Sequence, residues 1–138
     1  MTMTDMPLNI FQVAGRAMSA QLVRMNTTAS NLANAGGVAT TAAQAYRTMK
    51  PVFRTQFDHA TGLATVNVER VVTAGEEPTK RYDPGNPLAD AEGNVFENAV
   101  DETRELVDML ESARTYQNNV EVMQTAKSMI VDTLKLGR

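Results

Sequence analysis

Carboxylates and amides gather between Asp83 and Asp101, and these groups supply the oxygen ligands that calcium prefers. If Gly93 is placed at the glycine of an EF-hand loop, Leu88 falls at the first ligand position and Ala99 at the position of the bidentate glutamate. The side chains of leucine and alanine cannot bind a cation. The segment is therefore predicted to be a solvated turn rather than a calcium site.

Histidine and cysteine chemistry has little support in this chain. There is one histidine, His59, and there is no cysteine. A transition-metal site or an activated nucleophile needs a second group of this kind. The adjacent carboxylates Asp101 and Glu102 suit the first turn of a helix, where the helix dipole favours negative charge. We predict no enzymatic activity, no metal, no cofactor and no small-molecule substrate.

The charge and hydropathy of the chain limit its partners. The net charge is −3 and the basic residues are dispersed, so nucleic acid is not an expected partner. No apolar run approaches the roughly 18 residues of a membrane span. Met1 to Pro7 contains no basic residue, and Asn9 and Gln12 interrupt the stretch that follows. We therefore predict neither a membrane span nor a cleavable signal peptide.

The first element that could position side chains runs from about Pro7 to Asn34. Its apolar residues recur at spacings of three and four, which is typical of one side of an amphipathic helix. Asn34, Gly36 and Gly37 provide a stop, because Asn and Gly accept the left-handed conformation that ends helices. The predicted stripe consists of Phe11, Ala14, Met18, Leu22, Met25, Ala29 and Leu32.

The middle of the chain, residues 38–100, has shorter apolar segments and most of the prolines. Tyr46 to Phe57 is strand-like, and Pro51 either restricts that strand to a sheet edge or splits it. Thr65 to Val72 alternates between apolar and polar residues until its phase shifts near the end. Pro84-Gly85 suits a type II turn. This region is predicted to be a short β unit with an extended strap.

The clearest periodicity lies between about Asp101 and Leu136. Its apolar residues follow a 3-4 heptad register that only Lys127 interrupts, and Gly137 follows it. This register favours a long helix that packs as in a coiled coil. The predicted stripe consists of Leu106, Met109, Ala113, Tyr116, Val120, Met123, Ile130 and Leu134.

Together these segments predict a mainly α fold with a small β insert. Long N- and C-terminal helices would form a coiled-coil-like bundle, with a short β-rich or extended region between them. Residues 1–37 and 101–138 would then be one discontinuous assembly domain, with 38–100 as its middle region. The first helix is net basic, whereas residues 101–138 contain seven acids and five bases. Opposite charge therefore favours pairing of the two ends.

Two segments resemble the terminal signatures of the flagellar rod, hook and hook-associated proteins. The N-terminal signature is matched by Ala29–Asn34, which Arg24-Met25-Asn26 precedes. The C-terminal signature is matched by Arg114–Asn119, Lys127–Met129 and Leu134–Gly137.

A third segment resembles the short proximal-rod branch of that family. The matching residues are Tyr82–Asp90 and Gly93–Val95. The three segments in this order are more specific than any one of them, and the resemblance covers nearly the whole chain. The sequence departs from the family at Phe96-Glu97-Asn98, where Met-Pro-Asn is expected.

The resemblance implies a structural subunit of the bacterial flagellar basal-body rod. Such a subunit would leave the cell through the flagellar type III export apparatus, without a cleavable signal peptide. In the periplasm it would assemble with copies of itself and with related rod proteins into a tubular shaft that transmits torque for motility. The expected assembly interface consists of Met18, Leu22, Met25, Ser30, Asn31, Leu32, Asn34, Leu106, Met109, Ala113, Tyr116, Asn119, Val120, Met123, Ile130 and Leu134.

Two questions stay open from the residues alone. A soluble coiled-coil adaptor, which binds a partner helix and forms no filament, is a second hypothesis for the function. Asn31 lies one residue off the apolar stripe, so it has either an intersubunit hydrogen bond or a local role. Asn34 is interpreted as a helix C-cap because glycines follow it.

Overall fold

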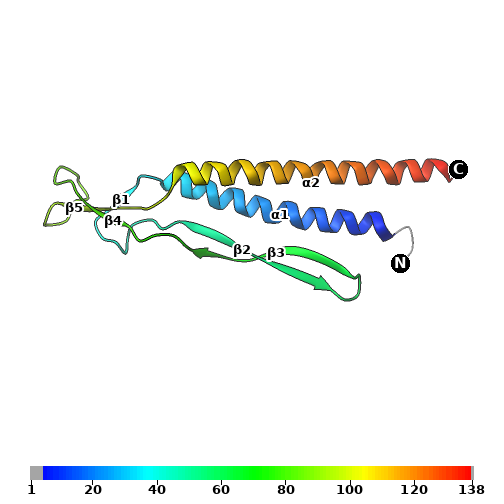
Figure 1. Cartoon of the computed structure of the whole chain (residues 1–138), viewed down its shortest axis with the longest axis horizontal. Coiled ribbons are helices and arrows are strands. Elements are labelled where there is room, and N and C mark those ends of the chain that lie inside the picture. The colour runs from blue at the N-terminus through cyan, green and yellow to red at the C-terminus, as the bar shows by residue number, and fades with distance from the viewer. Residues whose placement is uncertain (1–4, 138) are drawn as a thin grey trace.

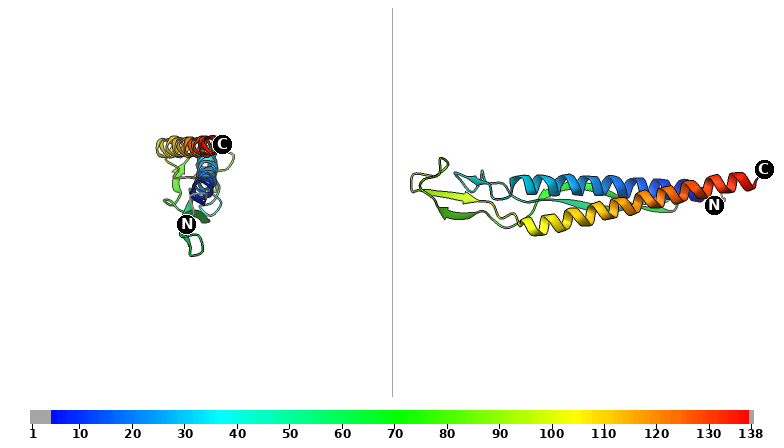
Figure 2. Two further views of the ribbon diagram at one scale, coloured as in Figure 1. Left: turned by 90° about the vertical axis from the view of Figure 1, so that its right-hand side faces the viewer. Right: turned by 90° about the horizontal axis from the view of Figure 1, so that it is seen from above.

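The protein is long and narrow, and its three main elements lie side by side (Figure 1). The computed structural model describes residues 5–137. Helix α1 (Asp5–Asn34) lies between helix α2 (Glu102–Leu136) and a hairpin of strands β2 (Met49–Asp58) and β3 (Leu63–Thr73). The helices are antiparallel, and the end-on view separates the three layers (Figure 2). The predicted mainly α fold with a small β insert is confirmed.

Both helices are bounded by the residue types that their sequence indicates. Helix α1 ends at Asn34, and Gly36 takes the left-handed conformation with φ of 70°. Asp101 is the N-cap of α2, where its carboxylate accepts a hydrogen bond from the backbone N–H of Arg104 at 3.1 Å. The N-terminus of the chain, on which the expectation of no signal peptide rests, lies outside the described residues.

The hairpin explains the phase shift in the sequence. Its strands pair antiparallel from Met49 opposite Thr73 to Asp58 opposite Leu63. The register slips by one residue between Val52 and Phe53, so that Glu69 of β3 has no partner. Such a bulge reverses the alternation of faces beyond it. Within residues 5–137, β2 pairs with β3 alone and runs through Pro51 without a break. Of the two predicted alternatives, an edge strand or a split one, the edge strand is therefore confirmed.

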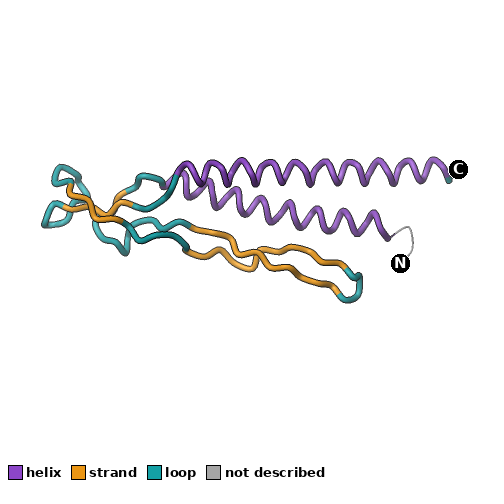
Figure 3. Tube along the Cα trace, viewed as in Figure 1, coloured by secondary structure: helices purple, strands orange, loops and turns teal. Residues whose placement is uncertain are grey.

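A second, three-stranded antiparallel sheet lies where α1 ends and α2 begins (Figure 3). Its order is β1 (Val38–Ala39), β5 (Asn94–Glu97), β4 (Thr79–Tyr82). The predicted type II turn at Pro84-Gly85 is wrong, because Gly85 does not have the positive φ which that turn requires. The left-handed glycine of this loop is Gly93, where a Cβ would lie 3.0 Å from the ring of Tyr82.

The buried core is small and largely polar. Among the described residues, the largest fully buried side chains are Val95, Asn31 and Ser112, and the other buried apolar residues are alanines. Among the residues whose burial is described, fifteen large apolar side chains are exposed, although large aliphatic residues are the ones most often buried in globular proteins. No helix within residues 5–137 is long and apolar enough to cross a membrane.

Candidate assembly surface

Small and polar residues form the side of α2 that packs against α1. Glu105, Ser112 and Ala126 are buried, and their separations are multiples of a heptad, which places them on one line along the helix. Beside this line, the carboxylate of Asp108 lies 3.3 Å from the guanidinium of Arg24 on α1. Small side chains on this line let the two helix axes approach closely.

The predicted heptad stripe of α2 overlaps this contact line at only half of its positions. We call this row of residues the contact line. It alternates between small or polar residues at one heptad position and larger half-buried residues four positions later. The remaining stripe members follow a contact residue by one position, about 100° further round the helix. The half-buried members on the line are Met109, Tyr116, Met123 and Ile130, and those displaced from it are Leu106, Ala113, Val120 and, in the exposed last turns, Leu134.

Helix α1 also has its polar contacts and its apolar stripe on different sides. Arg24 pairs with α2, and the guanidinium of Arg16 donates to Thr65 Oγ1 at 3.3 Å and to Gln56 Oε1 at 3.4 Å on the hairpin. The stripe residues Met18, Leu22 and Met25 lie about 100° or more around the helix from both arginines. Leu22 in this stripe is 44% exposed. Among the α1 residues whose burial is described, the buried ones are Ala14, which belongs to the stripe, and Ala20, Thr27, Thr28 and Asn31, which do not.

The α1 stripe and the α2 stripe residues that are displaced from the contact line lie on the same side of the helix pair, away from the hairpin. Arg104 and Asp108 of α2 line a pocket with Lys50 and Phe53 of the hairpin. Leu106 is on the other side of the contact line from these α2 residues. We define the apolar face as Met18, Leu22 and Met25 of α1 with Leu106, Leu110, Ala113 and Val120 of α2.

The periodicity of the sequence misses two parts of this arrangement. Leu110 is off the heptad register, yet at 71% exposure it is the most exposed member of the apolar face. The contact line is also missed, because its heptad position is filled by Glu105, Ser112, Asn119 and Ala126 rather than by large apolar residues. A search for small residues at heptad spacing would have found most of it.

The signature residues near the end of α1 make hydrogen bonds within the chain. Asn31 is 1% exposed and bonds to residues of α2, of β2 and of the segment before β2. The hydroxyl of Ser30 lies 3.3 Å from that of Tyr46. The side-chain amide of Asn34 donates to the Ser30 backbone carbonyl at 2.8 Å. The backbone carbonyl of Asn34 accepts a hydrogen bond from the side-chain amide of Asn98.

The other expected interface residues are spread along the helix pair. Leu32 is half-buried near the end of α1. Asn119 donates to the Thr115 carbonyl at 2.9 Å and borders an apolar groove with Val122 and Ile10. Leu134 lies in the last turns of α2 and is 68% exposed. These side chains therefore do not form one continuous patch with the apolar face.

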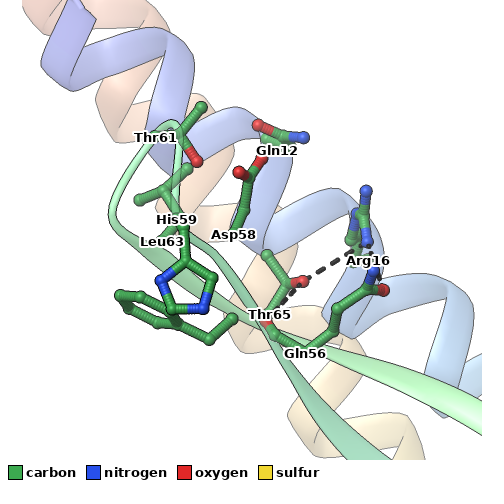
Figure 4. Close-up of a pocket in the computed structure, with 9 residues that line it drawn as sticks. Gln12, Arg16, Gln56, Asp58, His59, Thr61, Leu63 and Thr65 are labelled. Atoms are coloured by element: carbon green, nitrogen blue, oxygen red, sulfur yellow. Dashed lines mark hydrogen bonds between the residues drawn. The ribbon is translucent and has the colours of Figure 1, made fainter.

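A polar pocket between α1 and the hairpin tip contains the single histidine (Figure 4). His59 packs edge-on against Phe57, with ring centroids 4.9 Å apart. The backbone N–H of Ala60 donates to the carboxylate of Asp58 at 2.9 Å and holds the pKa of Asp58 below its usual value. Within residues 5–137 there is no cluster of three potential metal ligands. The arrangement joins the hairpin to α1 and offers no catalytic constellation.

Two family models match the terminal segments that contain the helices. A family described as "Flagella basal body rod protein" matches residues 11–38. A second, "Flagellar basal body rod FlgEFG protein C-terminal", matches residues 92–136. These ranges contain most of α1 and almost all of α2, the two elements that carry the apolar face.

Full-length relatives agree with these matches. The flagellar basal-body rod proteins FlgC of Salmonella typhimurium and of Escherichia coli O157:H7 are each 47% identical over 133 residues, which cover 95% of this chain and 98% of the relative. FlgC of Agrobacterium fabrum is 31% identical over 126 residues, which are 91% of both chains. The chain belongs to the FlgC family of flagellar basal-body rod proteins, which are structural subunits and not enzymes.

Proposed function

We propose that the protein, as a subunit of the flagellar rod, joins its neighbours through the apolar face of its helix pair. Its partners would be other copies of the chain and related rod proteins, in the proximal part of the rod. The helices, within residues 1–37 and 101–138, would form one discontinuous assembly domain. Residues 38–100 would face outward from it.

The observation that carries this proposal is the exposure of large apolar side chains. Burial of a leucine side chain stabilises a structure by about 1.5–3 kcal/mol, yet Leu22, Leu106 and Leu110 are exposed in the single chain. The helix contact line instead buries small or polar residues, with larger side chains between them only half-buried. A contiguous apolar surface on a soluble protein marks an interaction site, and neighbouring subunits in a rod would bury it.

Torque transmission and export complete the proposed function. Two long helices packed along their length resist bending better than separate helices, which suits a shaft subunit. Family membership supports a site of action in the periplasmic rod and export through the flagellar type III apparatus without a cleavable signal peptide.

A pair of matched lysine substitutions tests the assembly proposal. Leu106→Lys places a charge in the apolar face, whereas Asn118→Lys places the same charge on an exposed position across the helix. Leu106→Lys should be exported normally but abolish motility and be lost from isolated basal bodies. Asn118→Lys should retain most of its motility. Full motility of Leu106→Lys would contradict the assignment of the apolar face.

The same material tests the coiled-coil adaptor. An adaptor would bind a partner helix and would not be built into a shaft. Recovery of the native chain in isolated basal bodies, at a stoichiometry of several copies, would exclude the adaptor. Its absence from them would exclude the rod proposal.

A further inference from the structure

Asn31 lies where three parts of the molecule meet. It is in the last turn of α1, and its neighbours are Glu105 in the first turn of α2, Met49 at the start of β2, and Tyr46 just before that strand. Asn31 is 1% exposed and Glu105 is 4% exposed. These residues are far apart in the sequence, so only the folded chain brings them together.

Every hydrogen-bonding group of the Asn31 side chain is used. Its amide nitrogen donates to the Met49 carbonyl at 2.9 Å and to Glu105 Oε2 at 2.9 Å. Its amide oxygen accepts from the Tyr46 hydroxyl at 2.8 Å and from the Met49 N–H at 3.0 Å. A primary amide has two N–H donors and two acceptor lone pairs. No capacity is left for a neighbouring subunit.

We infer that Asn31 is a positioning residue that docks the β2–β3 hairpin onto the helix pair within one subunit. The inference rests on the proposed function, because the direction of the hairpin determines the outer surface that the subunit presents in the rod. It also resolves the choice that the sequence leaves open for Asn31, in favour of a role inside the chain.

The position of the contact along the hairpin explains its influence. Met49 and Thr73 form the first pair of the β2–β3 ladder, so holding Met49 determines the direction in which the hairpin leaves the helices. Further along, residues 53–58 of β2 are all exposed. Nearer the tip, the bonds of Arg16 to Thr65 and Gln56 measure 3.3 and 3.4 Å, at the long end of the normal range.

The buried carboxylate of Glu105 makes the site selective for asparagine. A buried carboxylate needs hydrogen-bond donors, and Asn31 supplies one. Aspartate at position 31 would keep the acceptor oxygens but lose both donors, and it would place a second carboxylate against Glu105. Asn31→Asp should therefore be more disruptive than Asn31→Ala, although aspartate has the same shape as asparagine.

Hydrogen exchange on the dilute monomer tests the inference without any assembly. In the native chain the amide of Met49 should be strongly protected. Asn31→Ala should raise exchange at Met49 and at the first hairpin pairs by tenfold or more, about the effect of losing a few buried hydrogen bonds. Exchange in the middle of α2 should change little. An unprotected Met49 amide in the native chain, or unchanged exchange in Asn31→Ala, would overturn the inference.

A double variant separates the specific contact from general damage. Asn31→Asp should lower Tm by roughly 10 °C. In the double variant Asn31→Asp/Glu105→Gln, the amide at position 105 can donate a hydrogen bond to the carboxylate at position 31. The double variant should therefore recover about half of that loss in Tm. The coupling is the difference between the double variant and the sum of the single variants. Additive effects would overturn the contact between positions 31 and 105.

The assembly readout distinguishes this inference from the proposed function. If Asn31 is instead an intersubunit contact, its variants will leave the monomer unchanged and remove the protein from basal bodies. If the apolar face is wrong but Asn31 positions the hairpin, the exchange result will hold while Leu106→Lys assembles normally. Tyr46→Phe is a matched mild variant, because it removes one of the four bonds, and it should raise exchange at Met49 less than Asn31→Ala does.

Discussion

The two sides of α2 differ in the size of their side chains. The side that is buried within the chain has small or polar residues, and the exposed side has large apolar ones. The side that contacts α1 buries Glu105, Ser112 and Ala126, whereas the apolar face exposes Leu106 and Leu110. Small residues allow close approach of two helices within the subunit, and large ones provide area for contact with other chains. Apolar periodicity therefore identifies a helix surface that is covered by another surface. It does not distinguish a partner helix in the same chain from a neighbouring subunit.

The largest effect on the single chain is expected where the contact line is tightest. Ser112 is fully buried and its hydroxyl donates to the Met109 carbonyl at 2.9 Å. Ser112→Leu should push the helices apart and lower the free energy of unfolding by about 2–3 kcal/mol, as overpacking does. Urea unfolding would measure it, with the exposed Thr125→Leu as the control. An unchanged midpoint would mean that the helices do not pack along this line.

A smaller effect is expected at one of the larger, half-buried residues of the contact line. Met109 is half-buried, so Met109→Lys loses part of its packing and brings a charge to the helix interface. The free energy of unfolding should fall by about 1–2 kcal/mol. Rod assembly and motility should be abolished while export continues. Full motility with normal export would show that this edge of α2 is not needed in the rod.

Glu111 provides a third test, because the structure revises its place. Glu111 is outside the predicted heptad stripe and would be expected to face solvent, but its carboxylate lies 3.5 Å from the guanidinium of Arg24, which also pairs with Asp108. Glu111→Lys should cost no more than about 1 kcal/mol, since the side chain is largely solvated. The cost should shrink as salt is added. A salt-independent loss in thermal unfolding would exclude this ion pair as its cause.

The smallest effect on the single chain is expected at Leu134. This side chain is exposed, so Leu134→Ala should change the free energy of unfolding by less than about 0.5 kcal/mol. If the last turns of α2 are covered in the rod, the variant should still be less abundant in isolated basal bodies. A clear loss of monomer stability would show that Leu134 packs within its own chain.

Local patterns were enough to predict most of the elements. Spacings of three and four identified both helices, and the alternation of Thr65 to Val72, with its phase shift, corresponds to a strand with a bulge at Glu69. Asn34 and the glycines after it marked the end of α1. The type II turn at Pro84-Gly85 was wrong because the loop places its left-handed residue at Gly93 instead.

The amino-acid sequence by itself determined the two amphipathic helices and two strand-like segments, because these depend on neighbours within a few residues along the chain. Three separate motifs in a fixed order indicated the family. Only the tertiary structure decided which side of each helix is buried. The fully buried residues of the helix contact are small or polar, and only half of the predicted apolar stripe of α2 lies on the contact line, so burial followed apolar periodicity only in part. Only the structure placed Asn31 against Glu105 and Met49, because hydrogen bonds between distant segments depend on how all three layers pack.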